Sequence, residues 1–433
     1  MTAAFSPCAG LAQDGGVALV FGIENRLEVV GNDALSVPAD GTDIANVTRL
    51  SFGLTSETAL DQLSFFVAGA AVVENPAGPA GTELDFGRGE ASFSYRREVP
   101  SAAFEITGEV RSDDIDSADS LDAVDETGSY TDYALSTRLE TGRTSTVGLQ
   151  FGLGYAATDY QDTTDPDLVD FREARADATV LLRFSETLTA RLGARYSERR
   201  EDDAGTTVTE TTVGFVGLDY AVSERLDLTT ELGYAQVETE EFDLIERETG
   251  PDLTLGATYD MPVGTLSGLF RVTRSVDEGQ RETLEIARAI ETPRDEITAR
   301  LGVTRADVTG TDVIGSLSLT RALPDGSIGL ELARTVAYDG DDAEETDTSA
   351  VSVNWLKNLN ESASISLDIS YEQSDSPSET IKQVTFGAGY SQRLTADWNL
   401  DTGVGYRIRD DNDGRARSPN LFVALSRDFQ IRP

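Results

Sequence analysis

Apolar residues alternate along residues 174–197, and five of the positions between them carry charged side chains that set the chemistry this stretch could support. Each lies between apolar neighbours: Arg175, Asp177, Arg183, Arg191 and Arg195. Charges gathered on one face of a strand can pair across strands, or they can line a water-filled passage and select ions. For any single residue, pairing and solvation is the more general of these two outcomes.

Later parts of the chain repeat the same alternation of charged and apolar residues. The further candidates for a charged inner face are Asp227, Glu231, Arg271 and Arg300.

The chain lacks the residues that most catalytic and metal sites need. It has no histidine and one cysteine, Cys8. This excludes Ser-His-Asp and Cys-His catalysis, an internal disulfide and a thiolate zinc site. Paired carboxylates leave one enzymatic route open, but we expect neither an enzyme nor a cofactor or metal.

Charge and hydropathy exclude two further classes. The chain has a formal net charge of −42, so it lacks the basic surface that nucleic-acid binding requires, and we exclude a nucleic-acid-binding protein. Only 39% of the residues are apolar, and they form no run of the roughly 18 residues expected of a transmembrane helix.

The alternation of residues 174–197 predicts a hairpin of two strands with one apolar and one polar face. Each apolar row is about as long as the roughly 9–11 residues with which a tilted strand crosses a bilayer. Around the turn at residues 185–187, Ala178 should lie opposite Ala194. This register sets Asp177 across from Arg195 and predicts an ion pair between them.

The same pattern recurs about every 20 residues from Val17 to residue 431, as expected of repeated antiparallel strands. We therefore predict an all-β fold, a closed antiparallel transmembrane β-barrel of about 22 strands, within a range of 20–22. In residues 84–97 the apolar positions change phase, which predicts a bulge near residues 87–89.

The predicted connections alternate in length. Short turns such as residues 262–264 and 324–326 are followed by longer acidic segments such as residues 112–128, 238–249 and 339–347. This alternation predicts short periplasmic turns and longer acidic extracellular loops. The loop carboxylates could bind divalent cations, or they could act only by solvation and mutual repulsion.

Aromatic residues close many of the apolar rows, as expected where a strand leaves the membrane. The predicted interface residues are Tyr155, Phe184, Tyr196, Tyr220, Tyr234, Tyr259, Trp355, Tyr371, Tyr390, Tyr406 and Phe429.

Residues 1–13 are predicted to be the remnant of a signal peptide or a disordered N-terminus. Gly10 and Ala12 fit a small-residue cleavage site, although the basic start and long apolar core are missing. Pro7 before Cys8 disfavours a lipoprotein signal.

With these features, residues 17–431 resemble bacterial outer-membrane β-barrel proteins of the porin-like class. The resemblance implies a Gram-negative outer membrane, contact with its lipid and lipopolysaccharide, and folding by the barrel-assembly machinery. That machinery reads a last strand with a terminal aromatic residue, here Phe429, although four residues follow it. TonB-dependent receptors also have 22 strands, but they carry a plug domain. Because the alternation begins at Val17, we expect no plug domain here.

The resemblance implies a channel for passive passage of small hydrophilic solutes. Two alternatives remain: an export conduit for a surface polymer that works with periplasmic partners, and a structural or adhesive surface barrel.

Overall fold

The computed structural model describes most of the chain from residue 16 onward. The described ranges are 16–33, 35–39, 41–75, 83–115, 128–163, 168–202, 205–242, 244–275, 279–307, 310–339, 344–412 and 414–431. Residues 1–13, the predicted signal-peptide remnant, lie outside them. The described part contains no helix that is long and apolar enough to cross a membrane.

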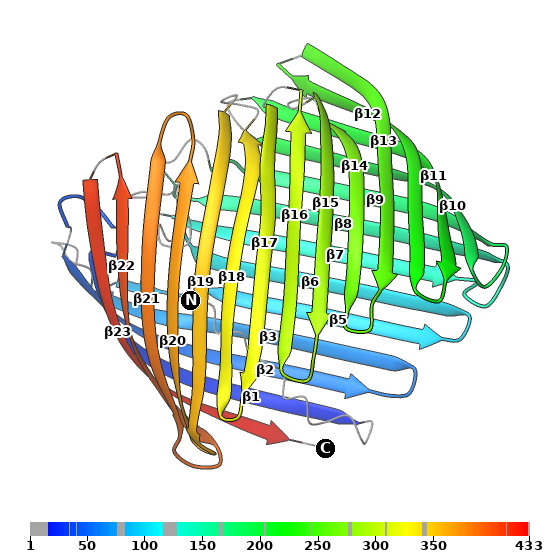
Figure 1. Ribbon diagram of the computed structural model, residues 1–433. Helices are drawn as coiled ribbons and strands as arrows, with labels where there is room; N and C mark the ends of the chain where they lie inside the picture. Colours follow the sequence, from blue (N-terminus) through cyan, green and yellow to red (C-terminus); the bar gives the residue numbers. More distant parts are fainter. Residues whose placement is uncertain are drawn as a thin grey trace.

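The alternating segments form antiparallel strands in the described ranges (Figure 1). In chain order they are β1 (Val17–Gly31), β2 (Thr42–Glu57), β3 (Asp61–Asn75), β4 (Glu83–Asp85), β5 (Gly89–Val99), β6 (Ala102–Asp114), β7 (Ser129–Thr141), β8 (Val147–Gln161), β9 (Phe171–Arg183), β10 (Leu188–Asp202), β11 (Thr206–Ser223), β12 (Leu226–Glu241), β13 (Leu244–Asp260), β14 (Thr265–Ser275), β15 (Gly279–Glu291), β16 (Asp295–Ala306), β17 (Gly310–Leu323), β18 (Gly326–Asp339), β19 (Glu344–Asn360), β20 (Ala363–Asp375), β21 (Thr380–Arg393), β22 (Trp398–Asp411) and β23 (Gly414–Ile431).

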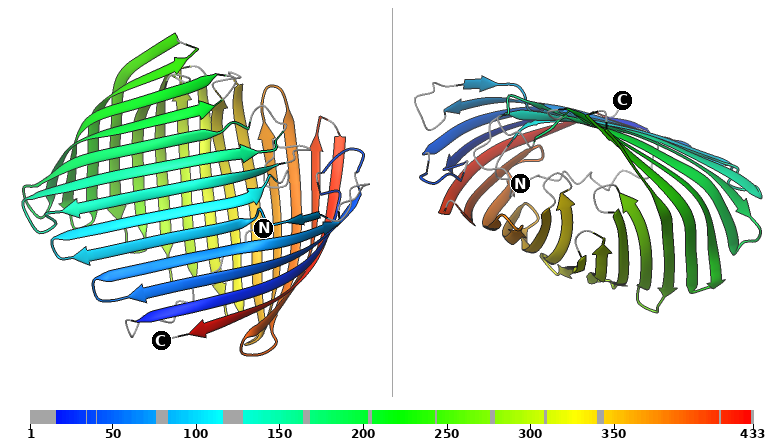
Figure 2. Two further views of the ribbon diagram at one scale, coloured as in Figure 1. Left: turned by 180° about the vertical axis from the view of Figure 1, so that it is seen from behind. Right: turned by 90° about the horizontal axis from the view of Figure 1, so that it is seen from above.

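The sheet closes on itself because β1 pairs with both β2 and β23. The short β4 pairs with the far part of β3 while β5 pairs with its near part, so these two strands make one position in the wall. The 23 strands therefore form a closed antiparallel barrel of 22 wall positions (Figures 1 and 2). The prediction of a closed antiparallel β-barrel of about 22 strands is confirmed.

The predicted bulge lies between β4 and β5. Val72 pairs with Asp85, and Gly69 pairs with Gly89. Two residues of β3 thus oppose three residues, 86–88, of the neighbouring wall position. The extra residue explains why the apolar phase of the sequence changes at this point.

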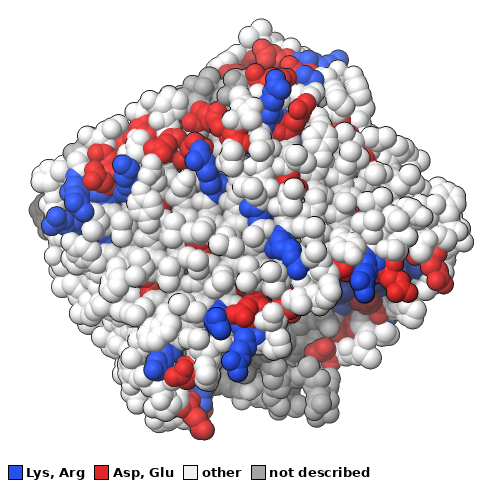
Figure 3. Space-filling view, viewed as in Figure 1, with Lys and Arg blue, Asp and Glu red and all other residues white. Residues whose placement is uncertain are grey.

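The outer face of the wall is apolar and the inner face is more polar and more buried. On β11, Val216 and Leu218 are 52% and 47% exposed, whereas the alternate residues Val213 and Phe215 are 7% and 5% exposed. Charged side chains gather at the two edges of the outer surface, with a largely uncharged band between them (Figure 3). Such a band is the surface that lipid tails would cover.

The prediction of long acidic extracellular loops is wrong for residues 238–249. They continue β12 and β13 as a ladder with two residues, 242–243, between the strands. Cross-strand pairs hold this extension together, for example Arg247 Nε donating to Glu238 Oε2 at 2.9 Å. Residue 339 likewise ends β18, and residues 344–347 begin β19. Outside the membrane both faces of a strand can carry charged residues. A run of acidic residues in the sequence therefore does not show where strand pairing ends.

Two inward-facing aromatic rings lie over glycines of the neighbouring strand. Phe215 on β11 is paired with Gly193 on β10, and Phe422 on β23 is paired with Gly403 on β22. A Cβ atom at Gly193 would lie 2.5 Å from the Phe215 ring and 2.7 Å from the Ala178 carbonyl oxygen. Absence of a side chain therefore lets the ring lie flat against the wall.

We expect Gly193→Ala to lower the free energy of unfolding by roughly 1–3 kcal/mol, because the ring must leave its position. Urea unfolding of the protein in lipid vesicles measures this value. The matched control is Gly214→Ala on the adjacent strand, where a Cβ atom meets nothing within 4 Å. Equal effects of the two substitutions would contradict the packing role of Gly193.

Candidate functional site in the barrel lumen

A network of charged side chains on the inner face of β10, β11 and β12 centres on Glu231. This side chain is only 6% exposed, and it accepts from Arg191 Nη1 at 3.2 Å and from Arg195 Nη2. Arg191 also contacts Asp219 through Nε at 2.9 Å. The Arg195 guanidinium lies 4.2 Å above the Phe215 ring, a cation–π contact. Arg191, Arg195 and Glu231 therefore lie on the inner face, as predicted from the alternation, and their charges are paired with one another.

The predicted hairpin register is confirmed, but the predicted ion pair is wrong. Ala178 pairs with Ala194, and Asp177 pairs with Arg195, as the turn implies. Among the described residues, however, Arg195 forms its ion pair with Glu231, two strands away. Asp177 instead lies against Gly152 of β8, where a Cβ atom would touch its carboxylate. Arg195 had a second acidic neighbour that a two-strand argument could not include.

Two other predicted lumenal arginines serve local structure. Arg175 donates through Nη2 to Glu173 Oε2 at 2.6 Å on its own strand. Arg183 lies at the short-turn end and donates through Nη1 to the carbonyl oxygens of Gly142 and Ser145 at 2.7 and 3.0 Å. It therefore fixes the turn between β7 and β8 and lies away from the middle of the lumen.

The remaining predicted residues are exposed on the inner side of the alternation. Asp227 and Arg300 follow this pattern on β12 and β16. Arg271 on β14 lines a hollow of about 220 Å³ together with Arg281 and Glu285 of β15. Within the described residues, these strands carry exposed charged side chains on the inner face, whereas the charges around Glu231 are already paired.

The sequence analysis missed a loop that folds against the inner face, described at residues 32–33, 35–39 and 41, which we name the mouth loop. Its Asp33 accepts from Arg407 Nη2 at 2.9 Å, and Asn32 Nδ2 donates to the Arg417 carbonyl oxygen at 3.2 Å. Leu35 is 2% exposed, and Arg409 on β22 is 1% exposed. The sequence signal was only polar composition, which does not show where a loop folds.

Several predicted interface tyrosines make the hydrogen bond that such a position favours. Tyr196 donates its hydroxyl to Glu198 at 2.9 Å and Tyr371 donates to Gln373 at 2.6 Å. On the opposite edge, Tyr390 donates to Gln392 at 3.1 Å. In each case the acceptor is two residues nearer the strand end, so the ring faces the apolar band and the hydroxyl faces water. The depth of these rings in a membrane stays a prediction.

The acidic segments provide no assembled cation site in the part of the chain that the structure describes. Within those residues, no group of three or more acidic or cysteine side chains is arranged to hold a metal ion. Much of the acidic segments, residues 116–127 and 340–343, falls outside the described ranges. Binding of divalent cations there stays a prediction.

The chain matches no protein-family model and no curated protein. Among solved structures it is similar to the FrpB iron transporter from Neisseria meningitidis, with a TM-score of 0.65 and 6% identity over 96% of this chain and 83% of that one. It is also similar to the siderophore receptor PirA from Acinetobacter baumannii, with a TM-score of 0.63 and 9% identity over 96% and 81%. The ferric-catecholate import receptor Fiu from E. coli K12 gives 0.60 and 9% over 96% and 82%.

These likenesses show a shared fold. The chain has the fold of bacterial outer-membrane β-barrel proteins, as the sequence predicts. The apolar outer band and this fold together place it in the outer membrane.

We expect Glu231→Gln to lower the free energy of unfolding by about 3 kcal/mol, because Arg191 and Arg195 would lose their shared buried anion. Unfolding in urea, followed by tryptophan fluorescence in vesicles, measures the loss. Glu331→Gln on β18 is the control, since Glu331 is exposed and forms no ion pair among the described residues. If both variants unfold like the wild type, the network around Glu231 does not stabilise the barrel.

Proposed function

We propose that this protein is an outer-membrane channel that allows small hydrophilic solutes to pass without an energy source. The observation that carries the proposal is the division of the inner face. Paired charges around Glu231 stiffen β10 to β12, while Arg271 on β14 and Arg300 on β16, two and four strands from β12 in the same sheet, leave exposed cationic groups. Exposed charges that bind a solute weakly allow it to enter and also to leave.

The mouth loop supports a size limit for the solute. It is held against β22 by the Arg407–Asp33 ion pair and against β23 by the hydrogen bond from Asn32 to the Arg417 carbonyl oxygen. A loop fixed in this way reduces the open cross-section at the end opposite the chain termini, while it leaves the wall around Arg271 uncovered.

A second candidate function is uptake of a bound metal chelate. The similar structures carry names that refer to iron and siderophores, and TonB-dependent receptors share the count of 22 strands. Such a receptor would bind its ligand tightly and would keep its lumen closed by a plug domain. Two further alternatives remain. An export conduit would conduct ions only together with its periplasmic partners, and a structural or adhesive barrel would conduct hardly at all.

Single-channel recording in planar bilayers tests the proposal. We expect the purified protein alone to give steady current steps in potassium chloride, because water-filled barrels with a polar lining conduct ions. Absence of current at all voltages would contradict a passive channel. Saturable, high-affinity binding of a ferric catecholate together with a silent bilayer would favour the uptake function.

A variant of the mouth loop excludes current from a contaminating porin. Replacement of residues 33–40 by two glycines should increase the conductance of each step, because the loop no longer occupies the mouth. A contaminant would give steps of the same size with both proteins.

A further inference from the structure

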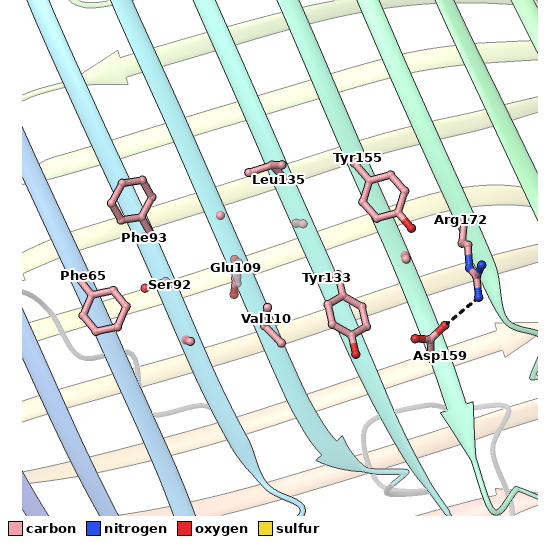
Figure 4. A pocket seen from close by; sticks show the side chains of 14 residues that line it. Phe65, Ser92, Phe93, Glu109, Val110, Tyr133, Leu135, Tyr155, Asp159 and Arg172 are labelled. Carbon is pink, nitrogen blue, oxygen red and sulfur yellow. Dashed lines mark ion pairs between the residues drawn. The ribbon is translucent and has the colours of Figure 1, made fainter.

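Two hollows in the barrel wall lie on opposite faces. The larger one is on the outer surface, where Phe93, Tyr133 and Tyr155 line it with side chains of the lipid-facing alternation (Figure 4). It is part of the apolar band already described. The smaller one, the hollow of about 220 Å³ that Arg271 lines, is on the inner face, and we name it the inner hollow.

Strand alternation places the inner hollow on the lumenal side of β14 and β15. The outward residues Leu284 and Ile286 of β15 are 55% and 59% exposed, whereas the alternate residues Thr283 and Glu285 line the hollow. Arg271 of β14 is paired with Thr283, so its side chain comes from the same face.

The inner hollow presents one cation and one anion that do not neutralise each other. Glu285 comes two residues after Thr283, the partner of Arg271, so the two charged residues are diagonal neighbours on adjacent strands. Such neighbours lie roughly 7–8 Å apart. Within the described ranges, neither Arg271 nor Glu285 forms an ion pair or a side-chain hydrogen bond. Both keep their hydrogen-bonding capacity for a ligand that fits between them.

Neighbouring residues hold the space between the two charges open. Thr283 Oγ1 lies 3.3 Å from Thr304 Oγ1, and Thr304 is only 4% exposed, so this hydroxyl pair is fixed in the wall. Gly302 is paired with Glu285, and a Cβ atom there would lie 2.7 Å from Glu285 Cγ. Because Gly302 has no side chain, the stem of Glu285 can lie close to the wall.

Apolar side chains line the part of the inner hollow beside Glu285. Leu269 of β14 is paired with Glu285, and Ile314 of β17 and Val336 of β18 complete the apolar wall. Pockets for drug-sized ligands measure about 300–1,000 Å³. A hollow of about 220 Å³ therefore suits a smaller solute with a short aliphatic group.

A second arginine of the inner hollow already has protein partners. Arg281 donates through Nη1 to Thr304 Oγ1 at 3.4 Å, and it interacts electrostatically with Glu345 of β19. Asp252 of β13 attracts Arg271 at longer range but does not line the hollow. Arg271 and Glu285 are thus the charged groups that face a solute there.

We infer that the inner hollow binds a zwitterionic α-amino acid with an aliphatic side chain, an inference that rests on the proposed channel function and names its solute class. Arg271 binds the carboxylate and Glu285 accepts from the ammonium group. The aliphatic side chain packs against Leu269 and Ile314. A simple anion would meet the like charge of Glu285, and a simple cation would meet that of Arg271.

Saturation-transfer NMR of the full chain in detergent micelles tests this site, because it detects weak binding. The probes are L-leucine, 4-methylpentanoate and 3-methylbutylamine, which share the branched tail and carry both charges, only the carboxylate or only the ammonium group. We expect L-leucine to bind the wild type at least about tenfold more tightly than either analogue. Equal affinity for all three probes would overturn the inference without any variant.

Substitutions in the inner hollow provide a second test. Arg271→Gln and Glu285→Gln should each weaken L-leucine binding by about tenfold through loss of one charged contact. The controls are Arg138→Gln and Glu331→Gln, since Arg138 and Glu331 are exposed on the inner faces of β7 and β18 and do not line the hollow. L-leucine binding that the hollow variants and the controls alter equally would overturn the site.

The binding assay and the bilayer recording fail independently. A protein that conducts ions but does not bind L-leucine would refute the amino-acid site and leave the channel function standing. A protein that binds L-leucine through Arg271 and Glu285 but gives no current would support the site and contradict passive passage.

Discussion

The requirement that every backbone N–H and C=O group in the hydrocarbon region finds a partner within the protein governs this structure. Pairing of β1 with β23, from Leu19–Ile431 to Val30–Asn420, removes the two free edges that an open sheet would expose to lipid. The interruption between β4 and β5 costs little because Ala70 N still donates to the Arg88 carbonyl oxygen at 2.9 Å. With the backbone satisfied, the two faces can differ in chemistry.

That division assigns different tasks to the faces. Outside, the apolar rows form the band that lipid tails would cover. Inside, charges that would be costly in lipid are paired around Glu231 or are exposed at Arg271 and Arg300. Glycines such as Gly193 let aromatic rings lie flat on the inner wall and support the arginines above them. The mouth loop then narrows one end of the barrel through the ion pair of Arg407 with Asp33.

Local period-two patterning predicted the strands, their number, the bulge near residue 88 and the register of the hairpin that contains Asp177 and Arg195. The partner of Arg195 could not be predicted, because Glu231 comes from a third strand whose register depends on another turn. Acidic composition wrongly marked residues 238–249 as a loop, since strands outside the membrane tolerate charge on both faces.

The central claim is that neighbouring residues of one strand face water and lipid in turn. Single cysteines at Thr298, Ala299, Arg300 and Leu301 of β16, in a Cys8→Ser background, test it most directly. A membrane-impermeant maleimide, applied to the protein in outer-membrane vesicles, should label positions 298 and 300 and spare positions 299 and 301, because only the first pair faces the aqueous lumen. Equal labelling of all four positions, or labelling of the opposite pair, would contradict the account.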